Sequence, residues 1–195
     1  PKNSLSVGKI LNFFKQKKNL KYVITQIQEN GLEFDTNEDH KKFRLDFTHP
    51  IKELLFVIQR EGVSPFDYDN SLKFVDDVYI VYENLKRLKL QLDDQVIISN
   101  KIGSVQFLKA VQARIHHSRT QLIRRFYSYS FALEPERWYP TGQRNLTLVK
   151  EQKLNLKLNG QINERELRVY AISYNILRYE NGRVRLLFNS GSISG

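Results

Sequence analysis

The feature that most constrains the fold is a series of alternating apolar and polar residues in the C-terminal third of the chain. Such runs begin at Tyr127, Leu154, Glu166 and Arg183, and Pro-Thr-Gly or Asn-Gly steps separate them. Alternation with a period of two is typical of strands that bury one face, and the short turn signals between the runs favour antiparallel neighbours. The sequence therefore predicts consecutive antiparallel strands here.

Upstream of this region, four more segments have the patterns of strands: 20–28, 43–47, 51–59 and 85–92. The third is almost continuously apolar, which favours a strand buried on both faces. Asn30-Gly31 is expected to end the first strand in a turn, and Asp93-Asp94 is expected to join the last to a further strand. Residues 61–77 are rich in Gly, Ser, Pro, Asp and Asn, so we expect a long loop that makes contacts. The predicted fold class is all-β.

Two segments have helical spacing instead. In residues 4–18 the apolar positions predict an arm or linker helix, which either packs on the domain or lies against a membrane or a neighbouring subunit. We therefore divide the chain into an arm, 1–19, and a domain, 20–195. A second helix is expected within residues 101–117. Its predicted apolar face consists of Val105, Leu108, Val111 and Ile115.

Composition narrows the classes of partner more than it narrows the fold. The chain has 195 residues, 41% of them hydrophobic, which is too many for a disordered protein. It has no cysteine, so disulfides and thiolate metal sites are excluded. A formal charge of +10 favours an acidic partner such as nucleic acid, anionic lipid or an acidic protein surface. The basic residues are spread along the chain, however, which weakens the case for nucleic acid.

No group of residues has the pattern of a catalytic or metal site. His116 and His117 are adjacent, and neighbours on a helix point about 100° apart, so they do not readily chelate one ion. Glu134 and Glu136 form a carboxylate pair, but Arg137 is next to them and nothing nearby indicates the burial that acid–base catalysis needs. Phosphate-binding loops and nucleophile motifs are absent from the sequence. We therefore predict no enzyme activity, no metal and no cofactor.

Arg124 and Arg125 precede Phe126, Tyr127 and Tyr129, and this group has two interpretations. It is either a platform that stacks bases and binds phosphates, or a strand with its aromatic face packed inward and its arginines directed outward. The apolar pattern continues into Phe131 and Leu133, which favours the strand.

Three ordered motifs resemble the double jelly-roll major capsid proteins of large DNA viruses. Tyr129-Ser-Phe-Ala-Leu-Glu-Pro-Glu136, followed by Pro140-Thr-Gly142 and Asn145, is similar to that family's signature. Residues 169–178 and 182–189 resemble its last two strands, and Thr48-His49-Pro50 with the apolar run that follows resembles an upstream segment. The likeness extends from about Phe43 to Asn189. Two departures are that the chain has room for one jelly roll only, matching the C-terminal one, and that it has Leu146-Thr-Leu148 where the family usually has Phe-Ser-Arg.

The resemblance implies an antiparallel jelly-roll β-sandwich of about eight strands. It further implies a structural subunit of the virion, assembled in the host cytoplasm, with homotrimeric pseudo-hexagonal capsomers forming an icosahedral shell. The implied partners are neighbouring capsomers, a first jelly roll in the same or a partner chain, and minor capsid proteins or an underlying membrane. The basic charge, which the resemblance does not predict, adds nucleic acid as a secondary candidate partner. The expected subunit contacts are Trp138, Tyr139, Phe66, Tyr68, Arg124 and Arg125.

Two other functions are kept as alternatives. A basic β-sandwich could bind nucleic acid or another polyanion through Arg124, Arg125, Lys101 and Lys109. A jelly-roll enzyme of the cupin type would need clustered inward-facing histidines, whereas the histidines here are flanked by proline or lie in loops and at a helix end.

Overall fold

The computed structural model describes residues 19–34, 40–60, 72–75, 78–81, 85–119, 126–159, 165–181 and 183–188. Its strands are β1 (Asn19–Phe34), β2 (His40–Leu45), β3 (Pro50–Arg60), β4 (Leu72–Val75), β5 (Val78–Val81), β6 (Leu85–Leu92), β7 (Gln95–Ile98), β8 (Phe126–Ser130), β9 (Arg144–Asn145), β10 (Gln152–Leu158), β11 (Arg165–Glu180) and β12 (Arg183–Leu186). A π-helical segment, η1 (Phe107–Gln112), continues into the short helix α2 (Ala113–His116). The helix predicted for residues 4–18 lies outside the described residues.

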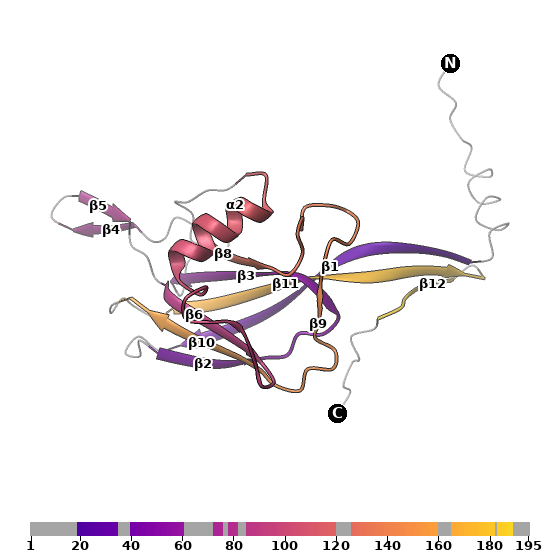
Figure 1. Ribbon diagram of the computed structural model, residues 1–195, viewed down its shortest axis with the longest axis horizontal. Coiled ribbons are helices and arrows are strands. Elements are labelled where there is room, and N and C mark those ends of the chain that lie inside the picture. Colours follow the sequence, from indigo (N-terminus) through magenta and orange to yellow (C-terminus); the bar gives the residue numbers. More distant parts are fainter. Residues whose placement is uncertain are drawn as a thin grey trace, which may run out of the picture.

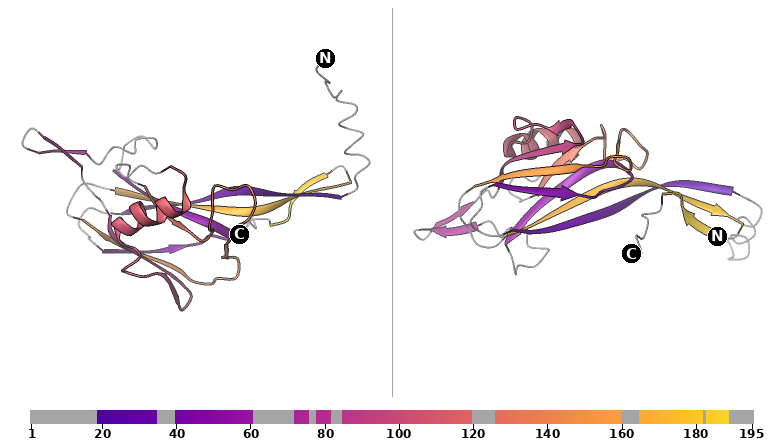
Figure 2. Two further views of the ribbon diagram at one scale, coloured as in Figure 1. Left: turned by 45° about the horizontal axis from the view of Figure 1, so that its top comes forward. Right: turned by 90° about the horizontal axis from the view of Figure 1, so that it is seen from below.

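The strands form two packed antiparallel sheets (Figures 1 and 2). One has the order β1-β11-β3-β8, with β12 added to β11 and β9 added to β3, and the other has the order β2-β10-β6-β7. Strands that are far apart in the sequence, such as β2 and β10, are therefore neighbours in space. This alternation of strands between two packed sheets, one of six strands and one of four, is the jelly-roll arrangement, which confirms the predicted fold class.

The core lies between the two sheets and is supplied by the apolar positions that alternate along the strands. In β6 the inward residues include Leu88, Leu90 and Leu92, and in β10 they are Leu154, Leu156 and Leu158. The facing sheet contributes a second set of buried side chains: Leu54, Phe56, Ile58, Tyr127, Leu167, Val169 and Ala171. Because side chains alternate between the faces of a strand, the residues between these positions lie on the outer surface of each sheet.

The turn predicted at Asn30-Gly31 is wrong. Strand β1 continues through both residues to Phe34, and Asn30 and Gly31 pair with Val169 and Arg168 of β11. The Asn30 amide donates to Asp46 on the segment that follows β2. Pairing with a long partner strand thus outweighs the local turn preference of an Asn-Gly step.

The predicted helix is confirmed, but part of its predicted buried face is wrong. Leu108 is fully buried and Ala113 is buried, whereas Ile115 is 66% exposed. The cause is the π-helical stretch, in which hydrogen bonds connect residues five apart rather than four. Leu108 and Ala113 are five residues apart, so the wider turn places them on one side and directs Val111 and Ile115 to the surface.

One predicted loop and one predicted strand also need correction. Residues 72–75, within the loop predicted for 61–77, form strand β4, which pairs with β5 as a separate two-stranded sheet. The strand predicted to continue through Leu133 instead ends at Ser130. Its backbone turns there because the amides of Phe131 and Ala132 both donate to the Lys52 carbonyl, at 2.9 and 3.2 Å.

Candidate assembly surface

The segment that joins β8 to β9 contains the signature Phe-Ala-Leu-Glu-Pro-Glu and the Pro-Thr-Gly turn, and we call residues 131–142 the signature loop. Its first residues are fixed to β3 through the Lys52 carbonyl. The Ser130 hydroxyl donates to the Ala132 carbonyl at 2.7 Å, which stabilises the bend at the end of β8. The loop therefore leaves the sheet in a defined direction.

The Lys52 side chain also stabilises the signature loop. Lys52 is buried, and its ammonium group donates to the Pro135 carbonyl at 2.7 Å. The same Nζ lies 5.5 Å from the centre of the Tyr174 ring, a cation–π distance. Burial lowers the pKa of the Lys52 ammonium, and the negative charge of Glu53 opposes that shift. Lys52 thus connects the middle of the loop to β3 and β11.

The far end of the loop is closed by polar contacts within the loop. The Thr141 hydroxyl accepts from the Glu134 amide at 2.9 Å and donates to the Glu134 carbonyl at 3.1 Å. Arg137 Nε donates to the Glu134 carboxylate at 2.7 Å. Gly142 has φ of 149°, and a Cβ there would lie 2.7 Å from the Phe131 carbonyl oxygen, so this position requires glycine. The Glu134 carboxylate is paired with Arg137 and is exposed, which does not suit acid–base catalysis.

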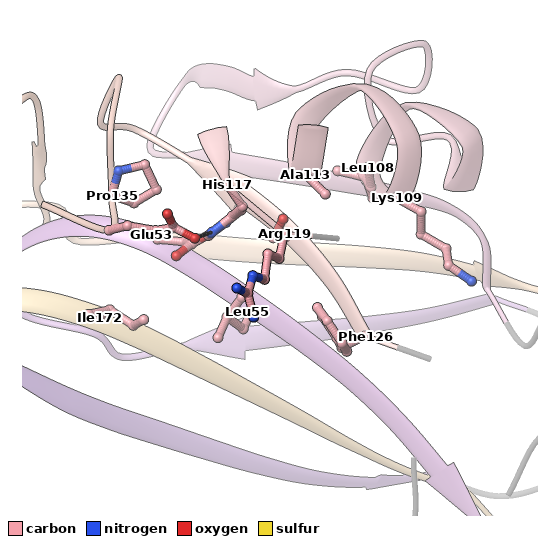
Figure 3. A pocket seen from close by; sticks show the side chains of 12 residues that line it. Glu53, Leu55, Leu108, Lys109, Ala113, His117, Arg119, Phe126, Pro135 and Ile172 are labelled. Atoms are coloured by element: carbon pink, nitrogen blue, oxygen red, sulfur yellow. Dashed lines mark hydrogen bonds and ion pairs between the residues drawn. The ribbon is translucent and has the colours of Figure 1, made fainter. Parts of the chain in front are cut away.

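The end of the helix holds the loop from its other side. His117 Nε2 lies 2.5 Å from the buried Glu53 carboxylate, and Figure 3 shows the two side chains pointing toward one another. Glu136 accepts from the Ser118 amide at 3.1 Å and lies 3.6 Å from His117 Nδ1. Hydrogen bonding to Glu53 raises the pKa of His117, and hydrogen bonds from Ser118 lower the pKa of Glu136.

The ion pair between His117 and Glu53 makes a pH-dependent contribution to the stability of the fold. The pKa of His117 is higher in the folded state than its ordinary value of 6.5. The ion pair therefore stabilises the fold fully below about pH 6.5. This stabilisation is lost as the pH rises through the pKa that His117 has in the folded state. We expect the difference in free energy of unfolding between the wild type and His117→Gln to shrink over that range. Urea titrations at several pH values would measure it.

The control for this prediction is the same substitution in a Glu53→Gln background. Without the carboxylate, His117→Gln should have a smaller effect with less dependence on pH, since the principal partner of the imidazolium is gone. A stability difference that grows as pH rises would contradict the assigned ion pair.

A pocket of about 370 Å³ lies between the helix and the outer face of the β3 sheet (Figure 3). Its lining is mainly apolar and includes Leu55, Phe126 and Ile172, with the Glu53–His117 pair at one side. Within the described residues no group of three His, Cys, Asp or Glu side chains could hold a metal ion. Glu53 and His117, at one side of the pocket, are joined to one another as an ion pair. This ion pair connects the end of the helix to strand β3.

The predicted contact residues separate into two groups. Trp138 and Tyr139 lie on the signature loop, 81% and 40% exposed, with their rings edge to face at 5.4 Å between centroids. Phe66, Tyr68, Arg124 and Arg125 lie outside the described residues, so their contacts stay predictions.

Sequence reasoning missed two features of this loop. Leu133 is 74% exposed at the position where a buried strand residue was expected, and Lys52 is buried within an apolar run. A lysine in the middle of a doubly buried strand was the available signal for Lys52, because a buried ammonium requires hydrogen-bond acceptors.

The fold places the chain in the class of antiparallel jelly-roll β-sandwiches, and its signature loop carries exposed aromatic residues. Residues 14–184 match the model of the family described as the large eukaryotic DNA virus major capsid protein. The chain belongs to this family. Its members are structural proteins, which confirms the prediction that the chain is not an enzyme.

Individual relatives agree with this family. The chain is 27% identical over 191 residues to the major capsid protein of Pyramimonas orientalis virus, covering 87% of this chain and 43% of that protein. The crystal structure of PBCV-1 VP54, fitted into a reconstruction of the virophage Sputnik, superposes with a TM-score of 0.73 at 20% identity, covering 88% of this chain and 52% of that one. The Faustovirus major capsid protein gives a TM-score of 0.68 at 12% identity, with 86% and 35% covered. The chain thus spans about half the length of these relatives or less, and the two structures show the shared fold.

Proposed function

We propose that the chain forms one jelly roll of a viral major capsid protein and acts as a structural subunit of the shell. The family match over residues 14–184 carries this proposal, and the fold shared with the PBCV-1 protein supports it. Residues 20–195 would form the jelly roll and residues 1–19 an arm. Because the chain spans only part of its relatives, a second jelly roll in the same or a partner chain would complete the protein.

The subunits would associate as trimeric capsomers that contact neighbouring capsomers in an icosahedral virion, assembled in the host cytoplasm. Minor capsid proteins or an underlying membrane are further proposed partners. The signature loop supports such association because Trp138 and Tyr139 are large, exposed and held by an anchored backbone. Aromatic residues of this kind dominate binding energy at protein interfaces, and an ordered loop loses little entropy on binding. Phe66, Tyr68, Arg124 and Arg125 are proposed as additional contacts.

Sedimentation velocity over a range of protein concentrations tests this assembly. We expect trimers for the wild-type protein, and we expect Trp138→Ala to weaken trimer or capsomer association by about tenfold or more, as loss of an aromatic anchor typically does. The substitution should leave the unfolding temperature nearly unchanged, because the Trp138 side chain is exposed.

A matched control is Tyr22→Ala, which removes another exposed aromatic side chain, on β1 and outside the signature loop. It should leave association closer to the wild-type value. Protein that stays monomeric at high concentration, with no related chain co-purifying, would overturn the proposed function. Equal effects of Tyr22→Ala and Trp138→Ala would overturn the role of the loop.

A further inference from the structure

The outer surface of the second sheet carries a compact array of cations. Strand β10 lies between β2 and β6, and the register places outward residues of the three strands in rows. The six cations of this array, which we call the basic face, are Lys42, Arg44, Arg87, Lys89, Lys153 and Lys157. Asn155 stands at the centre of the array, paired with Lys42 on one side and Lys89 on the other.

Like charges stand directly opposite one another in this array. Lys153 pairs with Arg44 on β2, and Lys157 pairs with Arg87 on β6. Like charges at cross-strand positions destabilise a sheet. Residues that destabilise the fold locally are expected at surfaces that have a function. These like-charge pairs therefore indicate an anionic partner, whose negative charge would offset the repulsion between them.

Carboxylates neutralise only a small part of the basic face. In the described part of the chain, Lys153 has an ion pair with Glu151 at 2.7 Å. No carboxylate in that same part forms an ion pair with Lys42, Arg87, Lys89 or Lys157. The surface is also hollowed, because a depression of about 630 Å³ is lined by five of the six cations together with the amides of Gln91, Asn100 and Asn155.

The chemistry of this surface distinguishes between three kinds of anionic partner. Protein interfaces have apolar or aromatic centres and few lysines, whereas the outward positions of these rows are cations, amides and a histidine. Peripheral membrane surfaces combine basic groups with apolar side chains that enter the bilayer, and a hollow does not match a flat lipid surface. Arg, Lys, Asn and Gln are the side chains that contact nucleic-acid phosphates.

We propose that the basic face binds the phosphate backbone of nucleic acid without reading its sequence. Three strands about 4.8 Å apart, with outward residues about 6.7 Å apart along each strand, give a face roughly 13 Å long. A duplex presents one charge per about 1.7 Å of its axis, hence about eight charges over that length, which is comparable to six cations. Phe, Tyr and Trp are absent from these outward positions, so the large aromatic platforms that stack on bases are not part of this surface.

The test is fluorescence anisotropy with a labelled DNA duplex of arbitrary sequence, titrated at several salt concentrations. Wild-type protein should bind at low salt, and affinity should fall with a log–log slope of up to about −5 for six neutralised phosphates. The triple substitution Arg87→Gln, Lys89→Gln, Lys157→Gln should weaken binding at least tenfold and make the slope shallower by about 3. Its unfolding temperature should equal or exceed that of the wild type, because a like-charge pair is removed.

A control of equal charge is Lys21→Gln, Arg183→Gln, Arg185→Gln, which removes three exposed cations from β1 and β12. It should retain affinity and slope close to wild type. Equal weakening in both triples would overturn the proposal in favour of a general effect of net charge, and no binding at low salt would overturn it outright. Tighter binding to phosphatidylserine vesicles than to the duplex would overturn it in favour of a membrane. Sedimentation of the same triple variant separates this result from the proposed capsid assembly, which does not depend on the basic face.

Discussion

Replacement of Phe56 by alanine is expected to lower the free energy of unfolding by about 4 kcal/mol. Phe56 is fully buried in the middle of β3, where it pairs with Val169 of β11 and Tyr127 of β8. Both neighbours belong to the core between the sheets. The substitution therefore removes a ring from the centre of the sandwich and leaves a cavity that surrounding strands, fixed by their hydrogen bonds, can close only in part.

The size of this loss matters because domains are only marginally stable, by about 5–15 kcal/mol. For a chain of this size a loss of about 4 kcal/mol corresponds to a fall in unfolding temperature of roughly 8–16 °C. Urea titration followed by far-ultraviolet circular dichroism would measure the free energy, and a thermal scan would measure the shift.

Leu55→Ala is the matched control for this prediction. Leu55 is adjacent in β3 but faces outward toward the pocket beside the helix, and it is only partly buried. Its loss should cost about 1–2 kcal/mol, since part of the side chain is already in contact with water. Equal costs for the two substitutions would contradict the assignment of the inner face of β3.

The strands were predictable wherever a single face is buried. In β6 and β10 the leucines alternate with lysine, glutamine or asparagine, so their period of two is visible without any knowledge of partners. Strand β3 was predictable from its apolar run. The extension of β1 beyond Gly31 was not, because it depends on pairing with β11, whose residues lie more than a hundred positions away in the sequence.

The phase of the helix could not be predicted for a different reason. The apolar residues Val105, Leu108, Val111 and Ile115 fit a regular α-helix. Residues 105–116 contain no proline or glycine that would signal the π-helical turn. Only the packing of Leu108 into the sandwich and of Ala113 on the same side shows that the turn is wider.

The candidate surfaces differ in how much the sequence reveals of them. Trp138 and Tyr139 could be proposed as contacts from the sequence because they lie within one contiguous motif. The basic face was missed because each of its three strands supplies only alternate residues, as with Lys42 and Arg44 of β2 or Lys153 and Lys157 of β10. Cations that are spread along the sequence, and that weakened the case for nucleic acid there, become one surface once β10 pairs with both neighbours.

Replacement of Gly103 by alanine is expected to be severely destabilising, by about 3 kcal/mol or more. Gly103 is buried in the turn between β7 and the helix, and its carbonyl accepts from the Leu88 amide at 2.8 Å. A Cβ at this position would lie 1.6 Å from the Leu88 carbonyl oxygen and 3.1 Å from that of Ser99. Both atoms belong to the backbone, so the overlap cannot be relieved by rotating a side chain.

The turn would therefore have to move away from β6, which would break the hydrogen bond to Leu88 and shift the start of the helix that inserts Leu108 into the core. Gly31→Ala provides the control, because a Cβ there meets nothing nearer than the Glu166 carboxylate at 3.8 Å. Glycine weakens the interior of a strand, so Gly31→Ala should be neutral or stabilise by about 0.5 kcal/mol. Thermal unfolding of the two variants side by side would measure the contrast, and a Gly103→Ala protein as stable as Gly31→Ala would show that the turn does not pack against β6 as described.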